Sequence, residues 1–489
     1  MMSKKHKDIA PTPVLRVQDL AVLHRQDALV QGISFQIAAG GVFTLLGESG
    51  SGKSLLAQAV MGKLPAQLRC EGSIELAGRR SDAADQHARH AAWGRQMALL
   101  PQEPWLALDP TMQVWRQVAL TYELVSRAAQ DSQNDSLRTA RNGARQAALA
   151  DLDRLGLAQA AHKYPFMISG GMAQRVAFLA THATGAPLMI IDEPTKGLDH
   201  ERRNDMLALL QAAQAEGIGL LCITHDVWLA HALGGEVGVL LDGNLVEHGP
   251  ARQVLERPQH AYTQRLLAAD PQRWPHATPS ASHDVDHATP VVEITGLAKS
   301  FGEQHLFSGI DARIAPGEVV AVNGPSGAGK TSFGNIVLGL LQPDAGSVRR
   351  APGLPATAFQ KLYQDPVAAF VPGLTLKQAL RDLIRLHRLD WQELEYLLQR
   401  MRLPLELLER KPGQVSGGEL QRIALARVLL LKPALIFADE PTSRLDPLTQ
   451  QEVVQLMLEQ CRRHRSALLL VTHDIYLARN VADRSIRLG

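Results

Sequence analysis

The sequence has few aromatic residues, few cysteines and no long apolar run. Aromatic residues make up 4% of the 489 residues, so aliphatic side chains must fill most of any core. The three cysteines are scattered and form neither a disulfide framework nor a metal-binding cluster, which is typical of a reducing compartment. No stretch reaches the roughly 18–20 apolar residues that a membrane-spanning helix needs. The basic N-terminus lacks the apolar segment of a secretory signal. We therefore expect a protein that is soluble or bound peripherally to another subunit.

The charge is nearly balanced as well. A formal net charge of +2 gives no global electrostatic reason to expect nucleic-acid binding. Hydrophobic residues make up 45% of the chain, which is ordinary for a globular protein with a sizeable core. The length of 489 residues corresponds to about two to four domains.

One pattern occurs twice in the sequence, the phosphate-binding loop G-x-x-x-x-G-K-[ST]. In such a loop backbone N–H groups surround a phosphate, and glycines permit the close approach and positive φ angles that this requires. The lysine reaches the β/γ-phosphates and the hydroxyl residue binds Mg²⁺. The predicted phosphate-binding residues are Gly47, Glu48, Ser49, Gly50, Ser51, Gly52, Lys53 and Ser54 in the first half and Gly324, Pro325, Ser326, Gly327, Ala328, Gly329, Lys330 and Thr331 in the second.

The two halves share a layout of short apolar strands alternating with helical stretches, which predicts an α/β fold with a largely parallel sheet covered by helices. The expected strands are residues 14–20, 41–46 and 219–224, with counterparts at 291–297, 317–323 and 467–472. We expect a flexible N-terminus over residues 1–10, a first domain over 11–267, a linker over 268–290 and a second domain over 291–489. Residues 130–141 are polar and indicate an exposed insertion in the first domain.

A Ser-Gly-Gly sequence follows each phosphate loop, at Ser169 and at Ser416. A serine and two glycines at a helix start can offer a hydroxyl and N–H groups to an anion. About twenty residues later an apolar strand ends in Asp-Glu-Pro-Thr, beginning at Asp192 and at Asp439. The aspartate is suited to holding Mg²⁺, and the following glutamate, Glu193 or Glu440, is the candidate general base for an attacking water.

Three further landmarks recur in both halves. Thr-His-Asp follows a strand in each, so that His225 lies 225 − 193 = 32 residues and His473 lies 473 − 440 = 33 residues after the glutamate. Both histidines are candidates for contacting the γ-phosphate and holding the water. Gly197-Leu198-Asp199 and Arg444-Leu445-Asp446 fit loops at a subunit-like boundary. Gln102 and Gln364 follow short strands and are candidates for binding Mg²⁺ or the water.

This order of motifs resembles the nucleotide-binding domain of ABC ATPases, and the resemblance covers nearly the whole chain. It implies two P-loop NTPase domains, each with a mostly parallel sheet core, an antiparallel part and a helical subdomain, and it implies ATP and Mg²⁺ as cofactors. The resemblance places Phe301 and His24 where an aromatic residue stacks on adenine, and the histidine departs from that pattern. The signature residues that it assigns to nucleotide binding are Ser169, Gly170, Gly171, Ser416, Gly417 and Gly418.

In that family two nucleotide domains pair head to tail and trap ATP between the phosphate loop of one and the signature of the other. The resemblance therefore implies that Lys53 shares a nucleotide with Ser416, and Lys330 with Ser169. Both general bases, both histidines and both signatures are present, so we expect two hydrolytic sites within one chain.

The end of the first half carries a narrower resemblance. Residues 258–267 are similar to the H-P-Y-T-x-x-L element of ATPases that serve oligopeptide, dipeptide and nickel importers, with Gln-His-Ala-Tyr-Thr at this place. The residues after Gln102 also resemble that subfamily. The second half ends at Gly489, and we expect no counterpart of the element there.

These resemblances imply an ATPase coupled to import of peptides, nickel or a related small solute, at the cytoplasmic face of the inner membrane. The expected partners are two integral membrane permease subunits and a solute-binding protein, with membrane-facing contacts near residues 101–115 and 364–374. No direct nucleic-acid binding is expected. The alternatives are a soluble ABC ATPase that acts on ribosomes or nucleic acid, and an accessory ATPase of a phosphonate-metabolism complex. The solute itself cannot be read, since its binding site would lie in other polypeptides and the 18 histidines are dispersed.

Overall fold

The computed structural model describes residues 13–103, 107–129, 136–276, 289–325 and 327–488. The chain divides into two compact units, residues 1–267 and residues 268–489, and each is described by itself. The expected flexible N-terminus, residues 1–10, lies outside the described residues, as do residues 130–135 of the expected insertion. Within the described residues, no helix is long and apolar enough to cross a membrane.

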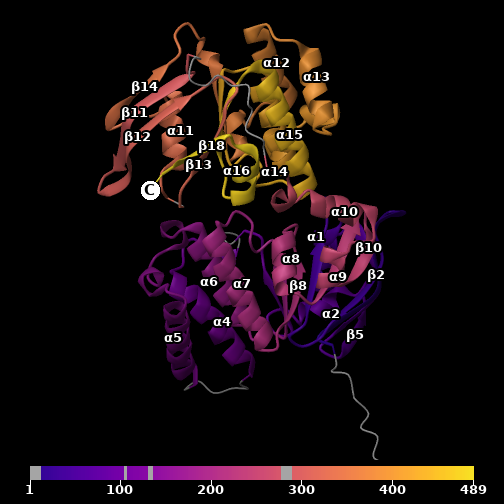
Figure 1. Ribbon diagram of the computed structural model, residues 1–489. Coiled ribbons are helices and arrows are strands. Elements are labelled where there is room, and N and C mark those ends of the chain that lie inside the picture. The colour runs from indigo at the N-terminus through magenta and orange to yellow at the C-terminus, as the bar shows by residue number, and fades with distance from the viewer. Residues whose placement is uncertain (1–12, 104–106, 130–135, 277–288, 326, 489) are drawn as a thin grey trace, which may run out of the picture. The chain divides into compact units, whose positions relative to one another are not determined.

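The first unit alternates strands and helices (Figure 1). Its strands are β1 (Leu15–His24), β2 (Asp27–Ile37), β3 (Val42–Leu46), β4 (Leu68–Leu76), β5 (Arg79–Asp82), β6 (Met97–Leu100), β7 (Leu188–Asp192), β8 (Gly219–Ile223), β9 (Glu236–Leu241) and β10 (Asn244–Pro250). Its helices are α1 (Lys53–Met61), α2 (Gln86–His90), α4 (Val114–Ala129), α5 (Ser136–Arg154), α6 (Gly170–His182), α7 (His200–Ala215), α8 (Val227–Leu233), α9 (Ala251–Glu256) and α10 (Ala261–Ala268).

The second unit repeats this layout. Its strands are β11 (Val292–Phe301), β12 (Gln304–Ile314), β13 (Val319–Asn323), β14 (Ala345–Arg350), β15 (Phe359–Leu362), β16 (Leu435–Asp439), β17 (Ala467–Val471) and β18 (Arg484–Arg487). Its helices are α11 (Lys330–Leu338), α12 (Leu376–His387), α13 (Trp391–Arg400), α14 (Gly417–Leu430), α15 (Pro447–His464) and α16 (Ile475–Val481). Short 3-10 turns lie at Ala158–Ala160, Pro165–Met167, Pro271–Arg273, Ala356–Ala358, Pro366–Ala369, Leu405–Glu409 and Pro412–Gln414.

Each unit contains two sheets. The larger one has the order β10-β9-β3-β8-β7-β6 in the first unit and β15-β16-β17-β13-β18 in the second. Its strands pair in parallel, except that β10 runs antiparallel to β9. The smaller sheet is antiparallel, with the order β2-β1-β4-β5 or β12-β11-β14. The α/β fold with a parallel core, an antiparallel part and a helical part is thus confirmed in both units.

The opening strands are longer than the sequence analysis expects. β1 continues to His24 through a register shift, and the shift coincides with a positive φ of 48° at Asp19. β11 continues to Phe301 through a similar shift, where Gly296 has a φ of 58°. Such a bulge inserts an extra residue and interrupts the alternation of apolar side chains, which is why the predicted strands stop early.

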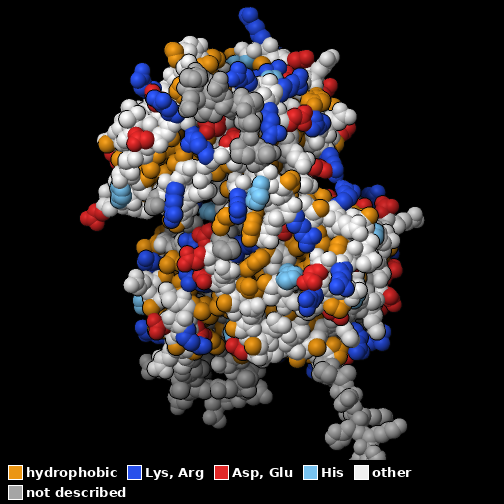
Figure 2. All heavy atoms as spheres, viewed as in Figure 1, with side chains coloured by type: hydrophobic (Ala, Val, Ile, Leu, Met, Phe, Trp, Pro, Cys, Tyr) orange, Lys and Arg blue, Asp and Glu red, His pale blue; other side chains and the backbone are white. Residues whose placement is uncertain are grey.

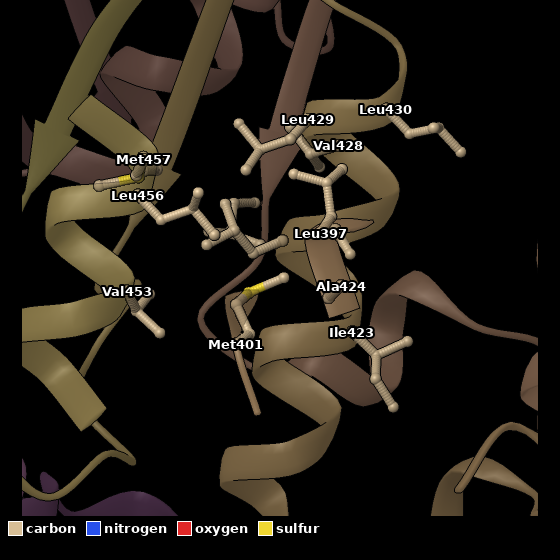
Figure 3. Packing of buried hydrophobic residues seen from close by; sticks show 14 of the residues in the cluster. Leu397, Met401, Ile423, Ala424, Val428, Leu429, Leu430, Val453, Leu456 and Met457 are labelled. Atoms are coloured by element: carbon tan, nitrogen blue, oxygen red, sulfur yellow. The ribbon is translucent and has the colours of Figure 1, made fainter. Parts of the chain in front are cut away.

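Aliphatic side chains fill the cores, as the low aromatic content requires. In the second unit, α13, α14 and α15 pack through Leu397, Ile423, Val428, Leu456 and similar residues (Figure 3). These residues are at most 2% exposed. In the first unit a comparable cluster joins α4, α5, α6 and α7 to the sheet. Cys70, Cys222 and Cys461 are buried and unpaired by disulfides.

Part of the expected linker belongs to the second unit and packs against the rest of it. The side-chain amide of Asn480 in α16 donates to the carbonyl oxygens of Pro271 at 2.7 Å and Trp274 at 3.3 Å. The Trp274 ring lies against the apolar cluster of the same unit. Residues 277–288 lie outside the described residues. The polar composition of residues 268–290 gives no hint of these contacts, because they depend on one tryptophan and on backbone carbonyls.

Candidate functional site

The strand order of the first unit brings its motifs together. The phosphate loop follows β3, and β8, β7 and β6 lie beside it in that order. His225 follows β8, Asp192 ends β7, and Gln102 follows β6. Because these strands are parallel, their carboxyl ends meet at one edge of the sheet. Motifs far apart in the sequence therefore lie at neighbouring strand ends.

The second unit has the same arrangement. The phosphate loop follows β13, and β17, β16 and β15 lie beside it. These strands lead to His473, to Asp439 with Glu440, and to Gln364. The order of loop, histidine, acid pair and glutamine is thus identical in the two units.

The first phosphate loop is packed tightly against the end of β9. Gly47 has a φ of 153°, and a Cβ atom added there would lie 2.4 Å from the carbonyl oxygen of Leu240. Gly324 has a φ of 156°, and a Cβ atom added there would lie 2.5 Å from the carbonyl oxygen of Leu488. Only glycine fits at either position, which explains the first residue of each motif.

Both motif lysines are directed into their own loops. The Lys53 ammonium donates to the carbonyl oxygens of Gly47 at 2.8 Å and Glu48 at 2.7 Å. The Lys330 ammonium donates to Gly324 at 2.8 Å and Pro325 at 3.0 Å. Each lysine also starts a helix, α1 or α11, whose first N–H groups have no acceptors within the helix. This combination is well suited to an anion.

The glutamate of the first acid pair is buried and its backbone is strained. Glu193 has a φ of 49°, which is unusual for a residue other than glycine. Its carboxylate accepts hydrogen bonds from the Thr224 hydroxyl at 3.0 Å and from His225, whose Nδ1 lies 2.8 Å away. Burial raises the pKa of Glu193, but the charge and hydrogen bond of His225, together with Lys53, outweigh burial, and the net shift is downward. Burial opposes charge on His225 too, yet Glu193 raises the pKa of His225. The pair therefore favours carboxylate and imidazolium.

Glu440 repeats this geometry with a different ring nitrogen. It has a φ of 52° and is 8% exposed, compared with 9% for Glu193. His473 approaches it through Nε2, which lies 2.7 Å from the carboxylate. A backbone hydrogen bond to the neighbouring strand holds each strained glutamate. The Glu193 N–H donates to the carbonyl oxygen of Ile223 at 2.8 Å, and the Glu440 N–H donates to that of Val471 at 3.0 Å. Strain that recurs at two equivalent positions indicates a functional constraint.

The two aspartates differ in their partners. The Thr331 hydroxyl donates to Asp439 at 2.8 Å. No equivalent bond joins Ser54 to Asp192 among the described residues. Burial, followed by the neighbouring Glu193, raises the pKa of Asp192 to about 6. Burial also raises the pKa of Asp439, and the Thr331 hydrogen bond works in the opposite direction.

The Ser-Gly-Gly segments cap helices within their own units. Ser169 caps α6, and its hydroxyl accepts the Met172 N–H at 3.4 Å. Ser416 caps α14, where Glu419 completes a reciprocal capping box. The Glu419 carboxylate accepts both the Ser416 hydroxyl at 2.7 Å and the Ser416 N–H at 2.8 Å. The second segment thus carries a negative charge that the first one lacks.

Other predicted residues lie near their strand ends but make fewer contacts. Gln102 is half-buried and Gln364 is exposed. Phe301 ends β11 and is 52% exposed, with the Lys299 ammonium 5.2 Å from its ring centre. His24 ends β1 and is half-buried. Ser326 lies outside the described residues, as do residues 104–106 of the segment after Gln102.

Two contacts of the site were not predicted from the sequence. The aspartates of the Leu-Asp loops, Asp199 and Asp446, cap α7 and α15, and an aspartate directly before a helical pattern would have signalled this. The backbone N–H of Glu48 in the first phosphate loop also donates to the Tyr262 hydroxyl in α10, at 3.0 Å. No local sequence pattern predicts that bond, because 262 − 48 = 214 residues separate its partners.

Comparison with known families and proteins identifies the family of the chain. The family model described as ABC transporter matches residues 30–196 and 307–443. The chain is 31% identical to the ABC transporter ATP-binding protein YejF of Escherichia coli, over 97% of this chain and 93% of the relative. It is 30% identical to the peptidoglycan transport ATP-binding protein YejF of Agrobacterium fabrum, over 98% of this chain and 91% of the relative. It is also 30% identical to the glutathione import ATP-binding protein GsiA of Escherichia coli, over 96% of this chain and 84% of the relative.

Solved structures show a similar fold. The archaeal ribosome recycling factor aABCE1, crystallised with ribosomal stalk protein aP1, matches with a TM-score of 0.65 over 96% of this chain and 87% of that chain. An RNase-L inhibitor matches with a TM-score of 0.62. The identities are 20% and 19%, so these likenesses concern the fold alone.

Proposed function

We propose that this chain, which belongs to the ABC transporter family, is the ATP-hydrolysing component of an importer for peptides or a related small solute. ABC ATP-binding proteins hydrolyse ATP to power transport, and this chain carries two such domains. The observation that carries the proposal is the similarity to import ATP-binding proteins over nearly the whole chain. Both sets of motifs also meet at neighbouring strand ends. Relatives named for glutathione import and peptidoglycan transport favour a peptide-containing solute over nickel.

Within each unit we assign the phosphate loop to the phosphates of ATP. On nucleotide binding, Lys53 and Lys330 exchange the loop carbonyls for phosphate oxygens, and the N–H groups at the starts of α1 and α11 surround the phosphates. His24 and Phe301 end the strands that would face adenine. These assignments follow the family pattern residue by residue.

The hydroxyl and carboxylate oxygens near each loop fit Mg²⁺. Asp439 is 3% exposed and already bonded to the Thr331 hydroxyl, so two oxygen donors lie within reach of one ion. Ser54 and Asp192 are the corresponding donors in the first unit, and Gln102 and Gln364 complete the proposed sets. The ion would neutralise charge on the phosphate oxygens. The raised pKa of Asp192 supports this fit, because a nearby cation stabilises the charge of a half-buried carboxylate.

Glu193 and Glu440 are the proposed general bases for the attacking water. Each carboxylate is buried beside a histidine, His225 or His473, and that histidine orients it. Phosphoryl transfer depends mainly on positioning and charge stabilisation. The strained backbone of each glutamate fixes the direction of its carboxylate at the strand end. In the family arrangement, Ser416 would complete the site of Lys53, and Ser169 that of Lys330.

A cavity in the second unit supports a membrane partner. It has a volume of about 500 Å³ and is lined by residues beside Gln364, among them Phe359, Tyr363 and Ala368. Arg350, Lys361 and Arg427 also line it, and no acidic residue is among its described lining. Burial lowers the pKa of Lys361, so the charged form gains from an acidic partner. We propose that an acidic segment of a permease subunit enters this cavity, and that the chain lies peripherally on the cytoplasmic face of the membrane.

The ribosome-directed alternative gains no support. Likeness to the ribosome recycling factor concerns the fold alone at 20% identity. Figure 2 shows basic and acidic side chains interspersed over the visible face, without one large basic field. The formal net charge of +2 also gives no global electrostatic reason to expect nucleic-acid binding. No observation favours the phosphonate alternative.

Affinity purification from membranes tests the proposal. The chain, expressed with its genomic neighbours and crosslinked before extraction, should recover two integral membrane proteins and a solute-binding protein. Ala368 is exposed beside the cavity. Ala368→Glu should repel the acidic partner and reduce recovery, whereas the matched variant Ala368→Ser should not. Recovery of no integral membrane protein, even with crosslinking, would overturn the importer assignment.

A further inference from the structure

The first phosphate loop is tied to a segment outside the family match. The backbone N–H of Glu48 donates to the Tyr262 hydroxyl at 3.0 Å. Tyr262 lies in α10 and is 5% exposed, and the family match ends at residue 196 in this unit. A buried tyrosine hydroxyl normally finds a partner, and here that partner is the second residue of the loop.

The segment around Tyr262 is itself held in place. The Glu247 carboxylate, on β10, accepts the backbone N–H groups of Gln259 at 2.8 Å and His260 at 3.0 Å, just before α10 begins. Leu266 and Leu267, further along α10, are fully buried. Because these contacts hold α10 on both sides of Tyr262, the tyrosine hydroxyl has a fixed position from which it can hold the phosphate loop.

The second phosphate loop has a proline at the position where the first loop has the N–H donor Glu48. Pro325 stands where the first loop has Glu48, because each is the residue after the first glycine of its motif. Proline has no N–H to donate, and its ring fixes φ. The preceding glycines have nearly equal φ angles, 153° at Gly47 and 156° at Gly324, so the two loops begin with the same geometry.

We infer that Tyr262 is a positioning residue for the first nucleotide site. It holds the start of the loop in its phosphate-binding shape through the Glu48 N–H, a task that the ring of Pro325 performs in the second loop. The inference rests on the proposed role of residues 47–54 in binding phosphate. Lys53 holds the Glu48 carbonyl, whereas Tyr262 holds the Glu48 N–H. The Tyr262 bond therefore persists when Lys53 turns toward phosphate.

Equilibrium binding of the ATP analogue AMP-PNP with Mg²⁺ tests the inference one loop at a time. The full chain with Lys330→Ala reports the first loop, and the full chain with Lys53→Ala reports the second. Tyr262→Phe removes only the hydroxyl and keeps the ring. In the Lys330→Ala background it should weaken binding roughly three- to ten-fold, the effect of one lost hydrogen bond. In the Lys53→Ala background it should change nothing.

The matched control is Tyr122→Phe. The Tyr122 hydroxyl bonds to Asp151 in the helical part of the same unit, away from the loop. This variant makes the same chemical change, and it should leave the first-loop affinity unchanged.

A second pair of variants isolates the N–H group. Glu48→Pro gives the first loop the proline of the second, whereas Glu48→Ala keeps the N–H and removes only the side chain. Tyr262→Phe should weaken binding in the Glu48→Ala chain but have no further effect in the Glu48→Pro chain. If Tyr262 had only a structural role, Tyr262→Phe would reduce AMP-PNP affinity by the same factor in the Glu48→Ala and Glu48→Pro chains. Each comparison is made within one Glu48 variant, so a loss of stability caused by that variant does not affect it.

Three outcomes would overturn the inference. They are unchanged affinity of the first loop in Tyr262→Phe, equal weakening at both loops, and an undiminished effect in the Glu48→Pro chain. If neither background binds AMP-PNP while Tyr262 is intact, the proposed function itself has failed, and the inference fails with it.

Discussion

The two candidate nucleotide sites place the same groups at the same strand ends, yet their immediate surroundings differ. Both have a buried glutamate with a positive φ paired to a histidine. They differ in the hydroxyl bond to Asp439, in the charge of Glu419 beside Ser416, and in what holds the start of the loop. The groups proposed for chemistry are thus shared, while those proposed to set binding strength differ. We expect two sites that hydrolyse ATP by one mechanism with unequal affinities.

Removing each proposed general base gives the largest expected effect. Glu193→Gln and Glu440→Gln should each reduce turnover at their own site by about 100-fold or more, the range for lost general-base catalysis. ATPase rates of the two single variants and the double variant measure this, and the double variant should be nearly inactive. If one single variant leaves turnover untouched, the expectation of two hydrolytic sites is wrong for that half.

Neutralising the half-buried Asp192 and the buried Asp439 should separate the two candidate sites by their effect on stability. Asp192 has a folded pKa of about 6, above the unfolded value near 3.8, so the folded protein binds the extra proton between these values. Its ionised form therefore costs stability at pH 7–8, and this cost disappears as pH falls through about 6 toward 4. Asp192→Asn should stabilise the nucleotide-free, Mg²⁺-free protein at pH 8 by about 2 kcal/mol, with little gain near pH 4.

Asp439→Asn is the matched variant for that measurement. Its gain should be smaller, because the Thr331 hydroxyl already stabilises the Asp439 carboxylate. Urea unfolding at the two pH values compares both variants with the unmodified chain. Equal gains from the two variants would show that the hydroxyl bond does not distinguish the sites.

Exchanging the residues beside the signature serines should shift affinity by a smaller factor. Glu419→Gln removes a carboxylate beside Ser416, and ATP binding at the Lys53 loop should tighten about three-fold. Met172→Glu places a carboxylate beside Ser169 and should weaken binding at the Lys330 loop by a similar factor. Binding in the Lys330→Ala and Lys53→Ala backgrounds measures each. Effects at the opposite loop would contradict the head-to-tail assignment.

The positions proposed to face adenine should give the smallest difference. Phe301 offers an exposed ring, whereas His24 is smaller and half-buried. His24→Phe should tighten ATP binding at the first loop by about two-fold, the lower range for an aromatic contact. Phe301→His should weaken ATP binding at the second loop by the same factor. Competition between ATP and triphosphate without a base checks the cause, because triphosphate affinity should not change.

The residues of the candidate site could be proposed from the sequence because its motifs are local. The loops at residues 47–54 and 324–331 owe their spacing to backbone geometry that a short pattern encodes. Adjacent acids after an apolar strand and a histidine after the next strand are also local signals. The bulges at Asp19 and Gly296 could not be predicted, since they break the alternation on which strand prediction depends.

The sequence by itself determined two α/β nucleotide-binding domains and the residues that would carry their chemistry, since each motif lies within a few consecutive residues. Only the tertiary structure decided that Glu193 and Glu440 adopt positive φ angles, that Tyr262 holds the first loop, and that Trp274 packs against the second unit. These features join residues distant in the sequence, or depend on a neighbouring strand. Their energies arise only when folding brings both partners together, so no local pattern records them.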